Sequence, residues 1–102
     1  MKIVKVQYTV RPEFVATNQG NIAAVAEEIK SSGLAGVKYT AWLLADGKTF
    51  MHFDLLENEK AHLALQELAS FKKFAGELHA SGLEAEPRLE LPTLVASTET
   101  YF

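Results

Sequence analysis

Apolar and polar residues alternate with a period of two at the start of the chain. The apolar positions from Val4 to Val10 share one side, and Pro12 follows them. This pattern predicts a strand with one apolar face that ends before the proline. From about 13 to 32 the apolar spacing becomes helical, and Gly33 stands where a helix-ending glycine is expected. A strand followed by a helix is therefore the first predicted unit.

Two further alternating segments follow, at about 36–45 and 49–56. The dipeptide Asp46-Gly47 lies between them and accepts the positive φ angles that a type I′ turn requires at both central residues. The two segments are therefore predicted to form an antiparallel hairpin. We expect the Val, Tyr and Met sides of the strands to face the helices.

The second half of the chain predicts two helices and a last strand. Asn58 suits the N-cap of one helix, and Ser70 suits the N-cap of a shorter helix that Gly82 ends. The segment 88–97 is rich in Leu and Val but contains Pro92, which has no N–H for a ladder hydrogen bond. This strand is therefore expected at a sheet edge.

The order of these elements predicts an α+β fold of the ferredoxin-like βαββαβ type. Its four-stranded antiparallel sheet would carry the helices on one face, and residues 1–102 would form a single domain. Right-handed crossovers place the first strand beside the third, and we expect a parallel pairing there.

The sheet face away from the helices carries a notable set of residues in this arrangement. They are Lys5, Gln7, Thr9, Lys38, Thr40, Trp42, Leu44, Phe50, His52 and Asp54. Trp42, Leu44 and Phe50 are poorly suited to permanent contact with water, so they predict an interface. Two such faces packed about a twofold axis would form a homodimer with a closed barrel, a dimeric α/β barrel. We expect Tyr101 and Phe102 to dock on the partner subunit.

Composition and charge narrow the classes of partner. The chain has 48% apolar and 23% charged residues and a formal net charge of -3, and its only adjacent basic pair is Lys72-Lys73. Nucleic acid binding is therefore not expected. Cysteine is absent, and no apolar stretch approaches the length of a membrane span. The alternating N-terminus does not have the pattern of a signal peptide, so we expect a cytoplasmic protein without membrane partners.

Three stretches of the sequence resemble the antibiotic biosynthesis monooxygenase-like domains of the dimeric α/β-barrel superfamily. They are Tyr8-Thr9-Val10-Arg11-Pro12, Phe53-Asp54-Leu55-Leu56-Glu57-Asn58-Glu59-Lys60-Ala61 and Leu68-Ala69-Ser70-Phe71-Lys72-Lys73-Phe74. The resemblance implies a homodimer with a small apolar pocket between sheet and helices in each subunit. Some members oxidise aromatic polyketides without metal or flavin, and others degrade haem. Where members often have Trp, this chain has Leu56, and where they often have Gly it has Glu13.

Three residues are candidates for catalysis. Asn18 lies one turn from both Phe14 and Ile22, so its amide either orients a ligand in a pocket or is solvated at an irregular helix start. His52 and Asp54 alternate onto one strand face, where they would form a tuned base, a two-residue metal clip without a third ligand, or a polar pair at the interface. Tyr39 offers a hydroxyl that either reaches a substrate or is satisfied in the core.

A ligand pocket is expected between the sheet and the helices. Its expected lining is Tyr8, Phe14, Asn18, Tyr39, Phe53, His62, Leu65 and Phe74. No cofactor and no metal is expected, and the ligand would be a small apolar molecule.

Three functions remain open at this point. The first is a small-molecule-binding barrel, with monooxygenase-like activity on an apolar or aromatic substrate. The second is a non-catalytic stress-related or ligand-binding dimer. The third is haem binding, for which His62 is the only axial candidate.

Overall fold

A computed structural model describes residues 1–102, and its element order is the predicted one. The elements are β1 (Lys2–Thr9), the short 3-10 helix η1 (Pro12–Phe14), α1 (Val15–Ser31), β2 (Val37–Leu43), β3 (Thr49–Leu56), α2 (Glu59–Glu67), α3 (Ala69–Ala80) and β4 (Ala85–Glu90). The ferredoxin-like βαββαβ prediction is confirmed, with the second helical crossover divided into α2 and α3.

The four strands form one sheet in the order β2-β3-β1-β4, and every neighbouring pair is antiparallel. The prediction that β1 lies beside β3 is confirmed, but the predicted parallel pairing is wrong. The crossover through α1 makes β2 parallel to β1, and the hairpin makes β3 antiparallel to β2. Since β3 lies between the two parallel strands, it is antiparallel to both.

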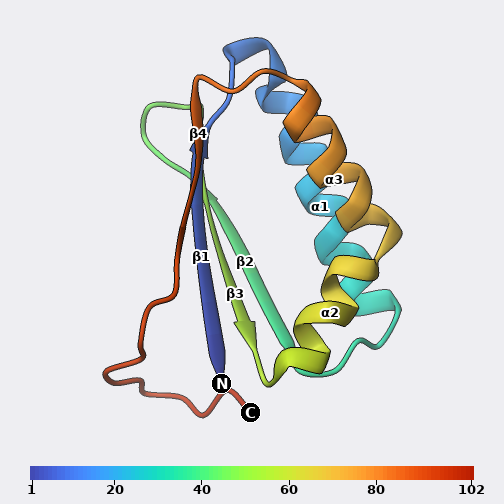
Figure 1. The fold of residues 1–102 in the computed structure, drawn as a ribbon, viewed down its shortest axis with the longest axis vertical. Helices are drawn as coiled ribbons and strands as arrows, with labels where there is room; N and C mark the ends of the chain where they lie inside the picture. Colours follow the sequence, from blue (N-terminus) through green and yellow to red (C-terminus); the bar gives the residue numbers. More distant parts are fainter.

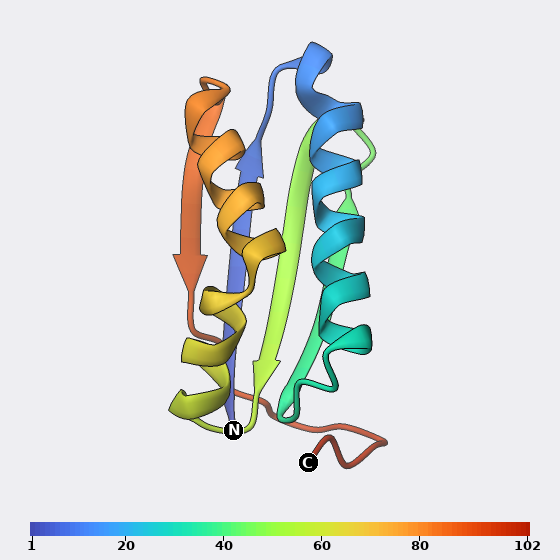
Figure 2. The same cartoon turned by 90° about the vertical axis from the view of Figure 1, so that its right-hand side faces the viewer.

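The helices all cover the same face of the sheet, as Figures 1 and 2 show. α1 packs beside α3, and the core between helices and sheet contains nine buried apolar residues. They are Val4, Tyr8, Val10, Val25, Phe50, Leu56, Leu65, Phe74 and Leu78. None of the three α-helices combines the length and the apolar character that crossing a membrane requires.

The β3 strand presents the opposite sides to those expected. His52 is the cross-strand partner of both Val6 and Ala41, and Phe50 is the partner of Tyr8. Phe50, His52, Asp54 and Leu56 therefore face the helices and are buried, and the Met51 side faces away. The alternation could not decide this, because both sides of β3 carry large apolar residues.

The hairpin turn differs from the predicted type. Gly47 has a φ of 76°, but no residue other than glycine has a positive φ, so Asp46 does not adopt the type I′ conformation. Its carboxylate instead accepts hydrogen bonds from the backbone N–H groups of Lys48 and Thr49. Asp46 therefore holds the loop by side-chain capping.

Two other boundaries needed correction. β4 ends at Glu90, so the proline in the edge strand is Pro87, and Pro92 lies beyond it. The third helix begins at Ala69, and Ser70 is not its cap, because the Ser70 backbone N–H and hydroxyl both donate to Glu28 Oε1. The Asn58 cap is confirmed, since its side chain accepts a hydrogen bond from the Ala61 N–H at 2.9 Å.

Candidate functional site

A cavity of about 140 Å³ lies between the helix-facing side of the sheet and α3. All four strands and α3 contribute to its wall, and its lining is mainly apolar. The lining residues are Val6, Tyr8, Tyr39, His52, Asp54, Phe71, Phe74, Leu78 and Pro87. It is the only hollow of the molecule into which several buried polar side chains converge.

Four side chains form a continuous chain of hydrogen bonds along the cavity. Asn18 Nδ2 donates to Tyr8 Oη at 2.9 Å, and Tyr8 Oη lies 2.7 Å from His52 Nε2. On the other side of the imidazole, Nδ1 lies 3.0 Å from Tyr39 Oη. The chain links α1 to three strands of the sheet through contacts that are buried or partly buried.

The donor and acceptor roles follow from counting hydrogens. Tyr8 Oη already accepts from Asn18, and the only acceptor near its own hydrogen is His52 Nε2. Nδ1 of the neutral ring then carries the hydrogen and donates it to Tyr39 Oη. The hydroxyl hydrogen of Tyr39 is consequently left free to donate to a group in the cavity.

His52 does not have the properties of the predicted catalytic base. Burial lowers the pKa of His52 to about 4, because the ring cannot be solvated when it is charged. The imidazole is therefore neutral near pH 7, and both of its nitrogens are engaged by tyrosines. His52 positions the two hydroxyls rather than accepting a proton from a ligand.

Asp54 is the ionisable group that faces the cavity without a partner. Only 8% of the residue is exposed, and its Oδ1 atom has no hydrogen bond. Burial raises the pKa of Asp54 to about 6, so it remains mostly ionised at neutral pH. The sequence pointed to Asp54 only as a partner for His52, and no hydrogen bond joins the two side chains.

The tyrosine hydroxyls do not ionise in this environment. Burial raises the pKa of Tyr8 and of Tyr39 well above the usual range, and the nearby Asp54 charge raises that of Tyr39 further. Both side chains therefore act as hydrogen-bond donors and acceptors, and the negative charge of the site belongs to Asp54 alone.

Asn18 lies behind the cavity rather than in its wall. The residue is completely buried, and its Oδ1 atom has no hydrogen-bond partner. Its contact with the site passes through the Tyr8 hydroxyl. Of the three residues expected to be catalytic, His52 and Tyr39 line the cavity and Asn18 supports it.

The other expected pocket residues divide between cavity, core and surface. Phe74 lines the cavity, Leu65 is buried in the core, and Phe14 packs against the core. Phe53 lies on the opposite face of β3, because its cross-strand partners are Lys5 and Thr40. Phe71 also lines the cavity; its spacing of three from Phe74 predicts that both lie on one helix face, but it was not among the expected pocket residues.

His62 is not placed to bind haem iron. Its Nδ1 atom lies 3.0 Å from Lys2 Nζ and its Nε2 atom 3.3 Å from Gln66 Nε2, and it does not line the cavity. The cavity is also well below the roughly 300 Å³ at which pockets for larger ligands begin. The residues present do not fit haem.

The open face of the sheet carries a different apolar set from the expected one. Phe50 is 2% exposed and stacks on Tyr8 inside the core, with ring centroids 5.8 Å apart, so it is not available to an interface. Leu44 lies just beyond the end of β2. The apolar side chains on the open face are Ile3, Trp42, Met51, Phe53 and Leu55.

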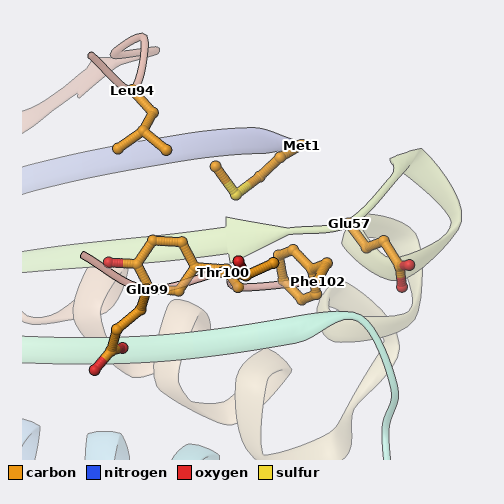
Figure 3. Close-up of a pocket in the computed structure, with 7 residues that line it drawn as sticks. Met1, Glu57, Leu94, Glu99, Thr100 and Phe102 are labelled. Atoms are coloured by element: carbon orange, nitrogen blue, oxygen red, sulfur yellow. The ribbon is translucent and has the colours of Figure 1, made fainter. Parts of the chain in front are cut away.

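The C-terminal aromatic pair lies against its own chain. The segment after β4 runs on the side of the sheet away from the helices (Figure 1). Tyr101 and Phe102 help to line an open groove of about 410 Å³ together with Met1, Leu94 and neighbouring residues, as Figure 3 shows. Lys38 Nζ lies 5.8 Å from the centre of the Phe102 ring.

Solved structures share the fold of this chain. No protein-family profile and no curated protein matches the chain. An antibiotic biosynthesis monooxygenase structure superimposes with a TM-score of 0.78 at 14% identity, covering 94% of this chain and 100% of that one. A candidate antibiotic biosynthesis monooxygenase from Bacteroides thetaiotaomicron gives 0.84 at 13% identity, covering 99% and 95%.

A third structure, Rv0793 from Mycobacterium tuberculosis, gives a TM-score of 0.79 at 12% identity over 96% of this chain and 98% of that one. These similarities extend over nearly the whole chain. The protein therefore has the fold of the antibiotic biosynthesis monooxygenase structures.

Proposed function

We propose that the protein binds a small, mainly apolar molecule in the cavity and acts on it as a monooxygenase-like enzyme. The observation that carries the proposal is the convergence of Tyr39, His52 and Asp54 on one mainly apolar cavity. Substrate sites in proteins are typically apolar hollows with a few converging polar groups. The names of structures with the same fold supply the reaction class.

Asp54 is the proposed proton acceptor. A carboxylate with a pKa of about 6 is mostly ionised at neutral pH and is a stronger base than an ordinary aspartate. It would take a proton from an acidic group of the bound molecule. The Tyr39 hydroxyl, which His52 Nδ1 holds in place, would donate a hydrogen bond to the negative charge that develops on the substrate.

Dioxygen is the proposed second substrate. It would add to the electron-rich, deprotonated molecule, so that one oxygen atom remains in the product. The substrate loses two hydrogens in the balanced reaction, and these leave with the other oxygen atom as water. The mainly apolar wall of the cavity would keep bulk water away from the intermediate.

A homodimer is the proposed working form. Trp42 is 56% exposed, and it lies beside Met51 on a sheet face whose other apolar residues are Ile3, Phe53 and Leu55. A surface of this kind favours a protein partner, and pairing of identical faces is the commonest symmetric assembly.

Oxygen consumption with hydroquinone tests the enzymatic part of the proposal. Hydroquinone has a single ring and an acidic hydroxyl, and conversion to hydroxybenzoquinone and water would satisfy the balance given above. We expect uptake above the uncatalysed rate, and we expect Asp54→Asn to abolish it. Glu27→Gln, which neutralises an exposed carboxylate on α1, is the matched control and should retain full activity.

Binding without turnover would instead support a non-catalytic ligand-binding protein. Nuclear magnetic resonance with phenol as the probe distinguishes the two cases. Chemical-shift changes confined to cavity residues such as Phe71 and Phe74 would support ligand binding even if no oxygen is consumed. Absence of both binding and turnover with these probes would contradict the proposed function.

A further inference from the structure

The carboxylate of Asp54 is a buried negative charge that the protein does not neutralise. No lysine or arginine lines the cavity, and the neutral His52 supplies no positive charge. The only cause that raises the pKa of Asp54 is its burial. An isolated buried charge is costly, and proteins normally pair it. The missing counter-charge is therefore a property of the site that needs an explanation.

Aromatic rings surround this carboxylate. Tyr8, Tyr39, His52, Phe71 and Phe74 all line the cavity. The Phe74 ring centre lies 5.3 Å from that of His52 and 5.9 Å from that of Phe71, so the rings form a continuous wall. The faces of Tyr and Phe rings carry partial negative charge and attract cations.

The free atoms of the site also define which groups a ligand needs. Asp54 lines the cavity and its carboxylate accepts no hydrogen bond from the protein, so a ligand that donates to it satisfies a group that otherwise has no partner. A cation on that donor would in addition neutralise the carboxylate.

We infer that the cavity selects a small organic amine, whose ammonium group donates to the Asp54 carboxylate while its hydrocarbon part packs against the aromatic wall. This inference rests on the proposed small-molecule binding and specifies the class of ligand.

The cavity volume limits the hydrocarbon part of this ligand. An apolar cavity of about 150 Å³ accommodates benzene, so the cavity of about 140 Å³ here limits a ligand to roughly one ring. Molecules with several fused rings exceed this volume. Benzylamine, with one ring and one methylene before the nitrogen, is therefore a suitable probe.

Three ligands of nearly the same shape test the inference by isothermal titration calorimetry at neutral pH. Benzylamine carries a cation, benzyl alcohol is a neutral donor, and benzoate carries a negative charge. We expect benzylamine to bind about tenfold more tightly than benzyl alcohol, since hydrogen bonds between charged groups are about twice as strong as neutral ones. Benzoate should not bind measurably, because Asp54 repels it.

Asp54→Asn removes the charge and retains a similar shape. In this variant benzylamine should bind no better than benzyl alcohol, whereas Glu27→Gln should retain the wild-type preference. Equal binding of amine and alcohol to the wild type, or an unchanged preference in Asp54→Asn, would overturn the inference. If Asp54→Asn does not fold, the order of the three ligands on the wild type decides by itself.

The outcomes separate this inference from the proposed function. If benzyl alcohol binds and benzylamine binds equally well or more weakly, the inference that the cavity selects an amine is wrong. The cavity would then be a site for neutral molecules. Absence of binding by all three ligands would contradict both the amine inference and the proposed small-molecule binding. As a second measurement, the methylene protons of bound benzylamine should shift upfield through the ring currents of Phe71 and Phe74, and the same shift should need a higher benzylamine concentration in Asp54→Asn.

Discussion

Tyr39 and Asp54 are direct cross-strand partners on the helix-facing side of the β2–β3 hairpin. Both residues line the cavity, where Tyr39 contributes a hydroxyl and Asp54 a carboxylate that accepts no hydrogen bond from the protein. The register of one hairpin therefore assembles the polar part of the cavity.

Asp54 and His52 should have opposite effects on stability between about pH 4 and 6. Burial raises the pKa of Asp54 from 3.8 to about 6, so the folded state binds more protons than the unfolded state in this range, and stability falls as pH rises. Burial lowers the pKa of His52 from 6.5 to about 4, so here the unfolded state binds more protons, and stability rises with pH. Each contribution is roughly 3 kcal/mol, and the two nearly cancel.

Asp54→Asn should expose the His52 contribution alone. We expect its free energy of unfolding to increase from about pH 4 to 6.5 more steeply than that of the wild type. At neutral pH it should be the more stable protein, because a costly buried charge is gone. Urea unfolding across this pH range measures both effects, and parallel curves for the two proteins would contradict the pKa assignments.

Tyr8→Phe should cost more stability than Tyr39→Phe. The Tyr8 hydroxyl bonds both Asn18 Nδ2 and His52 Nε2, and its removal leaves two buried polar atoms without partners. The Tyr39 hydroxyl contacts only His52 Nδ1. We expect a loss of about 2–4 kcal/mol for Tyr8→Phe and about 1–2 kcal/mol for Tyr39→Phe by urea unfolding. A larger loss of stability for Tyr39→Phe than for Tyr8→Phe would contradict the larger contribution of the Tyr8 hydrogen bonds.

A larger side chain at Val6 should close the cavity with little loss of stability. Val6 lines the cavity, so the added atoms of Val6→Phe enter space that is already present. The same change at Val25, which is fully buried and does not line the cavity, should cost about 1–3 kcal/mol through overpacking. Calorimetry with benzyl alcohol should detect no binding to Val6→Phe, and retained affinity would place the ligand elsewhere.

A charge at the centre of the open sheet face should separate the proposed dimer. Phe53 lies between Lys5 and Thr40 on that face, and Phe53→Glu would place a carboxylate within the interface. Sedimentation velocity should change from dimer to monomer. Leu63→Glu, at an exposed position on α2, is the control and should remain dimeric. A wild-type protein that sediments as a monomer at micromolar concentration would contradict the dimer.

The order of elements could be predicted from the sequence because local signals were consistent. Gly33 and Asn58 marked helix ends, and both do so in the structure. The orientation of β3 could not be predicted in this way, since Phe50 and Phe53 make both of its sides apolar. Hairpin register was the missing information, because pairing Leu43 with Phe50 fixes every residue of β3 to one face.

Only part of the candidate site could be predicted from the sequence, for the same reason. Tyr8, Tyr39 and Phe74 were assigned to the pocket, and all three line the cavity. Asp54 was assigned with His52 to the opposite face, as part of a tuned base, a two-residue metal clip or a polar pair at the interface. Only the three-dimensional structure shows that it is buried without a partner, since this property depends on segments distant in the chain.

Pro87 belongs both to the cavity wall and to β4, the outermost strand of the sheet beside β1. The ladder between these two strands is already irregular between Gln7 and Thr9. Fraying of this edge strand would widen the mouth of the cavity while the three remaining strands stay paired, at a free-energy cost below that of global unfolding.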